Sequence, residues 1–275
     1  MSQFKIMPEI STVDHAGYPA GLSMMEYYSN SDGFRDNAFF RPAPAGGDWV
    51  VVLHGFGSHG NQLFMRTDIR RTWLPVYLER GLGLLTPNLR NDPWMNPAAV
   101  EDMDSLLDFF RDNYGARRFF FESGSMGASG SLIYAALRPD NVAGVVARGA
   151  ATDLAAYHGW CRAAGAKDAL LGDIADSFEA AYGGTPEENP GLYRLHSPIF
   201  HVDNMKGIPI YLLHGTQDGL MPVSQSRRFA GAMGDNPLFA YVEIADGPHD
   251  APLSVPGWED SAIRAPLKWV VEKAG

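Results

Sequence analysis

Short apolar runs alternate with longer amphipathic stretches along most of this chain. Near the N-terminus, residues 22–28 and 37–41 alternate between apolar and polar positions on either side of a turn at 30–33, which predicts two strands. Beyond them, short apolar runs predict buried strands, and the stretches between have helical periodicity. Strands are predicted over 49–53, 83–87, 119–121, 142–147, 208–214 and 239–244, and helices over 63–80, 98–114, 126–137, 224–233 and 261–273.

Strands that alternate with helices of this length indicate a mostly parallel sheet with helices on both faces, so the predicted fold class is α/β. The chain has 275 residues, which is enough for one large core, and α/β folds of this size are commonly single domains. No repeat or low-complexity segment interrupts the pattern. We therefore expect one domain over residues 1–275.

The net charge and the cysteine count exclude several classes of partner. The formal charge is −10 at pH 7, which repels nucleic-acid phosphates and anionic lipid headgroups. No window approaches the roughly 20 apolar residues of a membrane span. Cys161 is the only cysteine, as is typical of a reducing compartment. We expect a soluble, cytoplasmic protein that binds neither nucleic acid nor membranes; the alternative is a precursor from which a signal peptide was cleaved.

Residues 123–127 (SGSMG) follow the apolar strand 119–121 and lead into a helix. This places Ser125 at the apex of a tight strand-to-helix turn, the arrangement called a nucleophile elbow. Small residues are needed two positions before and after the apex, because a Cβ there would collide with the neighbouring strand and helix. Gly127 meets that need, whereas Ser123 departs mildly from the G-x-S-x-G pattern. A flexible turn is the alternative, so the hypothesis depends on partners elsewhere.

A serine hydroxyl needs a base to accept its proton, and the base needs an acid to orient it. In a doubly wound sheet these side chains lie beyond the carboxyl ends of later strands, where the elbow opens. Asp218 follows the strand 208–214 and His249 follows the strand 239–244. Each alone could simply shape a loop, but together they complete the order Ser, Asp, His. We predict Ser125 as nucleophile, Asp218 as acid and His249 as base.

The remaining candidates have weaker contexts. Asp246 and Asp250 flank His249 too closely to reach the far side of its ring. Ser129 and Ser123 lie off the apex of the turn. The histidines without a catalytic context are His15 and, inside a long insertion where we expect local contacts, His158, His196 and His201.

The oxyanion of an acyl-transfer intermediate needs two N–H donors. One is the backbone N–H of Met126 at the start of the helix after the elbow, where the helix dipole also favours negative charge. The second comes from the loop 54–57 (HGFG), where glycines allow backbone amides to approach a ligand. We assign it to the backbone N–H of Phe56, and we expect His54 to be structural.

Residues 152–203 are far more than a crossover between two strands requires. Long insertions at strand ends are usually lids or pocket walls. Because the segment contains an amphipathic stretch at 168–182, we expect a small lid over the elbow. Phe56, Met126 and Trp160 are the expected apolar lining of the substrate pocket. The alternative is an extra surface helix in which Trp160 only packs within the lid.

Residues 55–60 (GFGSHG) also match G-x-G-x-x-G, the fingerprint of a dinucleotide-binding unit. Such a unit needs an acidic residue after the next strand for NAD, or a basic one for NADP. Residues 86–88 (TPN) stand there, so the NAD form fails, and Arg90 gives the NADP form little support. An oxidoreductase would not account for the predicted triad of Ser125, Asp218 and His249. The same holds for a non-catalytic ligand-binding protein.

With these residues assembled, the chain resembles α/β-hydrolases over nearly its whole length. The resemblance implies the α/β-hydrolase fold with a small lid insertion, Ser125, Asp218 and His249 as the catalytic triad, and oxyanion donors at Phe56 and Met126. Because Ser123 stands where the family usually has glycine, efficiency rather than reaction type is in question.

Three segments are similar to the prolyl-oligopeptidase-like and carbohydrate-esterase-like branch of that superfamily: 197–198 (SP), 209–218 (PIYLLHGTQD) and 221–223 (MPV). That branch contains peptidases with a large N-terminal propeller, which these residues do not include. It also contains stand-alone feruloyl, acetyl-xylan and polyester-degrading esterases.

The resemblance implies a serine esterase that cleaves carboxylic esters through an acyl-enzyme on Ser125, with small or aromatic acyl groups as in feruloyl and acetyl esterases. The expected substrate is a small or carbohydrate-linked ester. A serine peptidase of the prolyl-oligopeptidase type is the alternative, and an NADP-dependent oxidoreductase is a remote one. Because no H-E-x-x-H, cysteine pair or complete nucleotide motif occurs, we expect neither a metal nor an organic cofactor.

Overall fold

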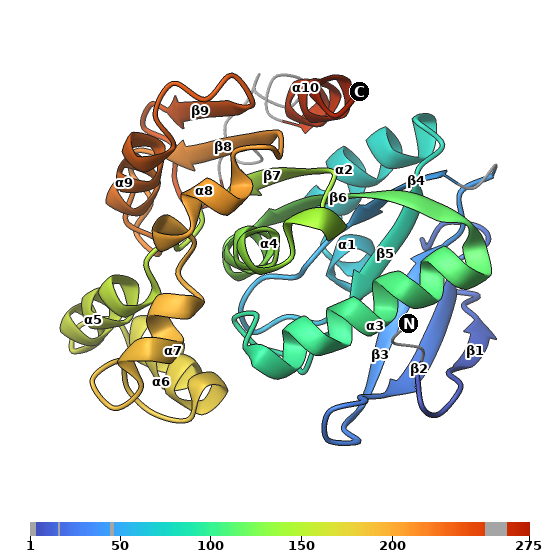
Figure 1. Ribbon diagram of the computed structural model, residues 1–275, viewed down its shortest axis with the longest axis horizontal. Helices are drawn as coiled ribbons and strands as arrows, with labels where there is room; N and C mark the ends of the chain where they lie inside the picture. The colour runs from blue at the N-terminus through green and yellow to red at the C-terminus, as the bar shows by residue number, and fades with distance from the viewer. Residues whose placement is uncertain (1–3, 16, 45–46, 251–262) are drawn as a thin grey trace.

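The computed structural model describes residues 4–15, 17–44, 47–250 and 263–275. Within these residues, one sheet of nine strands has the order β1-β2-β3-β5-β4-β6-β7-β8-β9 (Figure 1). The pairs β1 with β2, β2 with β3 and β3 with β5 are antiparallel, and the others are parallel. The strands are β1 (Glu9–Thr12), β2 (Ser23–Tyr28), β3 (Arg35–Arg41), β4 (Gly47–Val51), β5 (Gly83–Pro87), β6 (Ala116–Gly124), β7 (Gly144–Arg148), β8 (Ile210–Gly215) and β9 (Phe239–Ile244).

Helices cover both faces of this sheet, which confirms the predicted α/β class. The helices are α1 (Gln62–Met65), α2 (Thr67–Glu79), α3 (Pro97–Tyr114), α4 (Met126–Leu137), α5 (Leu154–Gly165), α6 (Ala169–Tyr182), α7 (Pro190–Leu195), α8 (Val202–Met205), α9 (Ser224–Met233) and α10 (Ala265–Lys273). Two 3-10 turns, η1 (Pro139–Asn141) and η2 (Pro198–Phe200), accompany them. No helix in the described ranges is long and apolar enough to cross a membrane.

Alternation of side chains along the central strands divides the core between the two faces. Phe119 and Phe121 of β6 pack in a cluster with residues of α3 and α4, while Phe120 between them packs with Val270 of α10. On the same side as α10, α2 covers β4 and β5, where Trp73 and Leu84 share a second cluster. The strands are therefore buried on both faces, which is why the sequence shows them as continuous apolar runs.

Three elements differ from the sequence prediction. Strand β1 was not predicted, because its four residues are all exposed and carry no apolar alternation. The predicted helix 63–80 is divided into α1 and α2 at Arg66, whose backbone is extended. Strand β6 is longer than predicted, since it runs through polar residues on both sides of its phenylalanines. Residues 261–262 of the predicted last helix lie outside the described residues.

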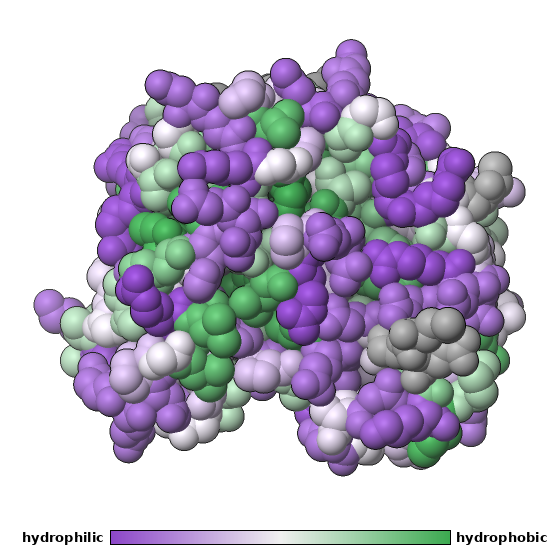
Figure 2. Space-filling model, in the orientation of Figure 1, coloured by the Kyte–Doolittle hydropathy of each residue, from purple (hydrophilic) through white to green (hydrophobic). Residues whose placement is uncertain are grey.

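The insertion predicted over 152–203 carries α5, α6, α7, η2 and α8, and Figure 1 shows α5, α6 and α7 grouped apart from the helices that cover the sheet. We call these three helices the cap. Asp153 and Asp168 begin α5 and α6 as N-caps, since each side chain accepts a backbone N–H of the first turn. Figure 2 shows hydrophobic residues gathered where the cap meets the rest of the molecule.

The contact between β4 and β5 provides a test of the packing. A Cβ on Gly83 of β5 would overlap the Trp49 ring, so we expect Gly83→Ala to lower the free energy of unfolding by about 1–3 kcal/mol through overpacking. Gly159 in α5 has open space around it, and Gly159→Ala should leave stability unchanged or raise it by up to about 1 kcal/mol. Chemical denaturation of both variants makes the comparison. Equal stability of the two would contradict this account of the β4–β5 contact.

Candidate active site

Ser125 lies between the last residue of β6 and the first residue of α4, with φ 58° and ψ −127°. A non-glycine residue in this region is strained and is found mainly at functional sites. Its backbone N–H donates to the Arg148 carbonyl at 2.8 Å. A Cβ on Gly127 would overlap the Leu53 carbonyl, so the turn requires glycine there. The sharp strand-to-helix turn expected of a nucleophile elbow is therefore present.

Ser123 has a structural function that glycine would not supply. Its buried hydroxyl accepts the backbone N–H of Leu53 at 2.9 Å, and the Ser131 hydroxyl lies 3.2 Å away. Leu53 directly precedes the loop 54–57. The departure from the glycine pattern thus connects the elbow to that loop.

Asp218 and His249 meet beyond the carboxyl ends of β8 and β9. His249 Nδ1 lies 2.8 Å from Asp218 Oδ2, and Asp218 Oδ1 accepts the backbone N–H groups of Leu220 and Met221 at 2.9 and 2.7 Å. Burial alone would oppose ionisation of the acid. Hydrogen bonds from His214 and His249 outweigh it and hold the pKa of Asp218 well below its usual range.

His214 is a member of this group that the sequence analysis did not identify. It is buried at the end of β8, with Nε2 3.3 Å from Asp218 Oδ2 and 2.9 Å from the Met221 carbonyl. Its Nδ1 lies 2.6 Å from the Ser226 hydroxyl. Because the residue stands within an apolar strand, the sequence pattern gives no indication that its ring faces the next loop.

The competing acidic residues and histidines contact other groups. Asp250 forms an ion pair with Arg66 at 2.8 Å. In the insertion, His158 Nε2 lies 2.9 Å from Glu179 Oε1, and His196 Nδ1 lies 2.9 Å from the Met95 carbonyl. His201 makes a similar local contact, with its Nε2 3.2 Å from the Arg194 carbonyl. His158 and His201 thus make contacts within the insertion, as expected, whereas His196 contacts a residue outside it.

The loop 54–57 is held on both sides of Phe56. The Gly55 N–H donates to Gln62 Oε1 at 3.0 Å, and the Gly57 N–H donates to Asp92 Oδ1 at 2.7 Å. His54 Nε2 lies 2.8 Å from the Asn88 carbonyl. Among the residues that the structure describes, the Phe56 N–H has no acceptor. It is therefore open to a ligand.

Met126, the other predicted oxyanion donor, is the first residue of α4. As the first residue of the helix, it has a backbone N–H without an acceptor inside the helix. Its side chain is buried and lines a separate small cavity with Trp94 and Met95. Its side chain therefore does not line the cavity around Ser125, contrary to our expectation.

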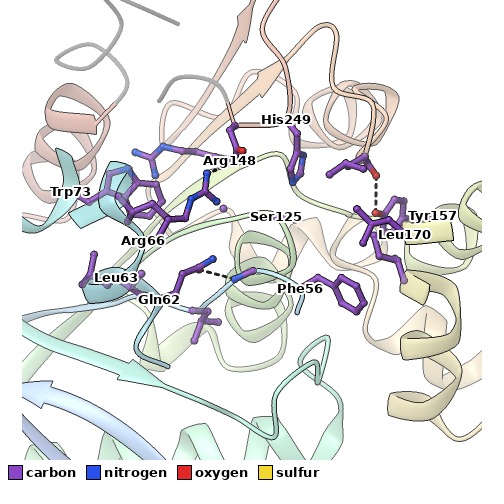
Figure 3. A pocket seen from close by; sticks show the side chains of 18 residues that line it. Phe56, Gln62, Leu63, Arg66, Trp73, Ser125, Arg148, Tyr157, Leu170 and His249 are labelled. Carbon is purple, nitrogen blue, oxygen red and sulfur yellow. Dashed lines mark hydrogen bonds and ion pairs between the residues drawn. The ribbon is translucent and has the colours of Figure 1, made fainter. Parts of the chain in front are cut away.

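Ser125 and His249 line one cavity of about 250 Å³. Figure 3 shows them near its centre, with Gln62, Leu63, Arg66 and Trp73 on one side and Phe56, Tyr157 and Leu170 on the other. Tyr157, Leu170 and Ile174 come from the insertion, which therefore forms part of the wall.

Trp160 does not line this cavity, contrary to our expectation. Its ring stacks on Tyr157, with centroids 6.0 Å apart. The two residues lie about one turn apart in α5. Tyr157, not Trp160, is the one whose side chain reaches the cavity. The sequence identified the insertion as a wall of the pocket, but the rotation of α5 decides which of its side chains reaches the cavity.

A buried ion pair stands at one wall of the cavity. Arg148 Nη2 donates to Glu122 Oε1 at 2.6 Å, and the guanidinium lies 4.5 Å from the centre of the Trp73 ring. Burial raises the pKa of Glu122, and the Arg148 charge opposes that rise. The sequence analysis assigned no role to either residue, because their pairing joins β6 to β7 across the sheet.

The G-x-G-x-x-G segment has a packing explanation in this fold. A Cβ on Gly60 would lie 2.8 Å from the Thr86 carbonyl, so the last glycine allows the loop to approach β5. Arg90, the one residue that supported NADP, forms ion pairs with Asp32 and Asp102 at 2.7 and 2.8 Å. In the described part of the chain, no group of three or more His, Cys, Asp or Glu side chains could hold a metal ion.

Comparison with known proteins agrees with this geometry. A sequence profile described as "alpha/beta hydrolase fold" matches residues 48–174. Esterase LipQ of Mycobacterium tuberculosis (strain ATCC 25618 / H37Rv) is 36% identical over 64 residues, which are 22% of this chain and 15% of that protein. The match therefore spans a small part of that esterase.

Several solved structures share the architecture at low sequence identity. The Pyrococcus furiosus esterase Pf2001 has a TM-score of 0.67 at 17% identity, over 90% of this chain and 91% of the other. FphF, a fluorophosphonate-binding serine hydrolase of Staphylococcus aureus, has a TM-score of 0.67 at 17% identity, over 92% and 99%. Est1E of Butyrivibrio proteoclasticus has a TM-score of 0.61 at 16% identity, over 90% and 98%.

The sheet order, the elbow and these matches define the class of the molecule, which has the α/β-hydrolase fold. The profile that carries the name of this fold covers residues 48–174 of the chain.

The contacts of the Ser123 hydroxyl lead us to predict that the glycine of the G-x-S-x-G pattern would lower stability at this position. Ser123→Gly and Ser123→Ala both leave the buried Leu53 N–H without its acceptor, which should cost about 1–3 kcal/mol of stability. Ser131→Ala is the control, because it removes only the weaker contact to Ser123 and a second bond to a helix carbonyl. Thermal unfolding of the three variants measures the difference. A Ser123→Gly protein as stable as the wild type would refute the role given to this hydroxyl.

Proposed function

We propose that this protein is a serine esterase in which Ser125 is the nucleophile, His249 the base and Asp218 the acid. The observation that carries the proposal is the 2.8 Å contact from His249 Nδ1 to Asp218 Oδ2, on a ring that lines the same cavity as Ser125 at the elbow. A hydrolase needs these three groups and an oxyanion site at one place. Chance alone rarely assembles them at one edge of a sheet.

In the proposed acylation step, the Ser125 oxygen attacks the ester carbonyl carbon while its proton passes to His249 Nε2. The carbonyl electron pair moves to oxygen, which accepts hydrogen bonds from the backbone N–H groups of Phe56 and Met126. The tetrahedral intermediate collapses, and the alcohol leaves with the proton from His249. Water then repeats the sequence on the acyl-enzyme, releasing the acid and Ser125.

The environment of Asp218 suits this cycle. Because its pKa is held well below the usual range, the carboxylate stays ionised while His249 gains and loses a proton. It can therefore fix the tautomer in which His249 Nδ1 carries the hydrogen, and it stabilises the imidazolium formed during attack. The additional contact from His214 keeps the carboxylate from rotating.

The size and lining of the cavity favour a compact ester. A volume of about 250 Å³ is below the usual range for drug-sized ligands. Apolar side chains of Phe56, Leu170 and Ile174 fit a small or aromatic acyl group, in keeping with the acetyl or feruloyl ester class suggested by the resemblance. Esterases among the similar proteins add support for ester chemistry.

A serine peptidase of the prolyl-oligopeptidase type remains the second candidate, because the elbow and triad would serve either bond. The amide is harder to cleave, since its amine leaves only after protonation by the histidine. Among the residues that the structure describes, the short helices of the cap form one wall of the cavity. A wall of this size suits a compact substrate better than a peptide.

The first test is a substrate panel of p-nitrophenyl acetate, butyrate and octanoate, methyl ferulate, acetylated xylan and a proline-containing peptide amide. We expect the highest kcat/KM for a short-chain or aromatic ester, because the cavity is small. EDTA present throughout should not change the rates, since the proposed mechanism uses no metal. The highest kcat/KM for the peptide amide would replace the esterase proposal with the peptidase.

Ser125→Ala is the control for that panel. Loss of a triad nucleophile typically removes about six powers of ten from kcat, so ester turnover should fall to the background rate. Labelling of the wild type by a fluorophosphonate should disappear in the variant while its unfolding temperature is retained. Labelling that persists, or that maps to Ser129, would identify another nucleophile.

The acid and base are tested by pH dependence. Only the neutral imidazole accepts the Ser125 proton, so kcat/KM should rise with pH as His249 loses its proton and then level off. Asp218→Asn should keep the fold and lower kcat by about 10⁴-fold, because the ring adopts the wrong tautomer. Asp246→Asn, which does not alter the cavity lining, is the matched control with a small effect expected. Asp250 lines the cavity, so Asp250→Asn tests it as a competing acid. A severe defect in Asp246→Asn or Asp250→Asn together with a silent Asp218→Asn would show that the acid is assigned wrongly.

A further inference from the structure

The loop 88–96 that follows β5 has an unusual backbone. Leu89, Arg90, Asn91, Trp94 and Met95 all have positive φ, between 44° and 67°, and none is glycine. Residues with a Cβ hold this conformation only where their surroundings impose it, and such strain is concentrated near functional sites. The contacts that impose it are therefore informative.

Both ends of the loop are anchored to other elements. At the start, the Arg90 backbone N–H donates to Asp36 Oδ2 at 2.6 Å, and its guanidinium contacts Asp32 and Asp102. At the end, Trp94 Nε1 donates to the Ser177 hydroxyl at 2.8 Å.

The cap adds further contacts to the end of the loop. The Tyr182 hydroxyl donates to the Trp94 carbonyl at 2.8 Å, and the Trp94 ring stacks on Phe178 at 4.0 Å. The loop is therefore a rigid connection between the sheet and the cap.

The middle of the same loop contacts the segment that carries Phe56. Asp92 Oδ1 accepts the Gly57 N–H at 2.7 Å, while Asn88 contributes its carbonyl to His54 and its side-chain oxygen to Gly60. Carboxylate acceptors make stronger hydrogen bonds to N–H groups than neutral ones. Gly55 and Gly57, on either side of Phe56, allow this stretch a wide range of backbone conformations. The Ser58 N–H and His54 Nδ1 hold the Gly55 carbonyl at 3.2 and 2.9 Å, and the bond to Asp92 adds an anchor on the far side of Phe56.

We infer that Asp92 is a positioning residue for the oxyanion site: its bond to the Gly57 N–H fixes the peptide orientation on one side of Phe56, so that the Phe56 N–H is aimed at the substrate carbonyl oxygen. The bond from Gly55 to Gln62 fixes the other side. Asp92 is not among the residues that line the cavity, so it acts through the loop. This inference rests on the proposed esterase function.

The test compares Asp92→Ala, Asp92→Asn and Asp32→Ala. Asp92→Ala removes the acceptor, and displacement of an oxyanion donor should lower kcat roughly 10- to 100-fold with little change in KM. Asp92→Asn keeps a side-chain oxygen for the Gly57 N–H, so it should retain kcat within about threefold. Asp32→Ala weakens the far anchor of the same loop without touching Gly57, and it should have wild-type kcat.

Affinity for phenyl trifluoromethyl ketone supplies a readout that a general loss of packing would not move. Ser125 adds to its carbonyl carbon, passes its proton to His249 and places the resulting oxyanion where the Phe56 N–H donates. Affinity should therefore weaken in Asp92→Ala by the same factor as kcat, while the pH dependence set by His249 stays as in the wild type. Unfolding temperatures are measured in parallel, and Asp92→Glu, which moves the acceptor by one methylene, replaces Asp92→Ala if the latter does not fold.

Three results would overturn the inference: an unchanged kcat in the variant that lacks the acceptor, an equal defect in Asp32→Ala, or a kcat loss without weaker ketone binding. These are distinguishable from failure of the proposed function, which would appear as absence of Ser125-dependent ester turnover in the wild type. That absence would overturn the inference as well, because it rests on the function.

Discussion

The hydrogen bond from the Ser125 N–H to the Arg148 carbonyl, 2.8 Å long, is the constraint on which the site depends. It extends the ladder between β6 and β7 by one step while the chain already turns into α4 at positive φ. The turn is possible because Gly127 lets α4 approach the Leu53 carbonyl closely. As a result, the first turn of α4, the end of β4 and the end of β6 meet at one point. Ser125, the proposed nucleophile, lies between two of these segments, Met126 begins α4, and Phe56 lies in the loop that follows β4.

Asp218 and His249, the proposed acid and base, reach the same point through a second close contact of backbones. A Cβ on Gly215 would overlap the backbone of Gly247, and the Gln217 N–H donates to the Gly247 carbonyl at 3.0 Å. The loops after β8 and β9 are therefore packed against each other, which brings the Asp218 carboxylate to the His249 ring. His214 completes this group from within β8. The carboxylate accepts bonds on both oxygens, and this accounts for its low pKa despite burial.

The cap and the loop 88–96 contact each other beside the cavity. Trp94 is buried and stacks on Phe178, and the cap supplies Tyr157, Leu170 and Ile174 to the cavity wall. The Phe56 ring lies 6.4 Å from the Trp94 ring. The loop 88–96 therefore accepts hydrogen bonds from two sides. Trp94 and Met95 are contacted from the insertion, and Asn88 and Asp92 are contacted from the loop 54–57. The loop 54–57 and the cap are thus connected through this segment.

The sequence by itself determined the α/β class and most strand and helix positions, because buried parallel strands are continuous apolar runs. It also singled out Ser125, Asp218 and His249 as candidates, because each follows a strand and the carboxyl ends of parallel strands share one edge. It also indicated that 152–203 is an insertion. Only the tertiary structure decided which side chains face the cavity. Tyr157 rather than Trp160 reaches it, Arg148 pairs with Glu122 across two strands, and His214 supports Asp218 from inside an apolar strand. Periodicity along one chain records which face of an element is apolar, but the rotation of a helix and the pairing of polar groups are set by contacts between segments far apart in the sequence.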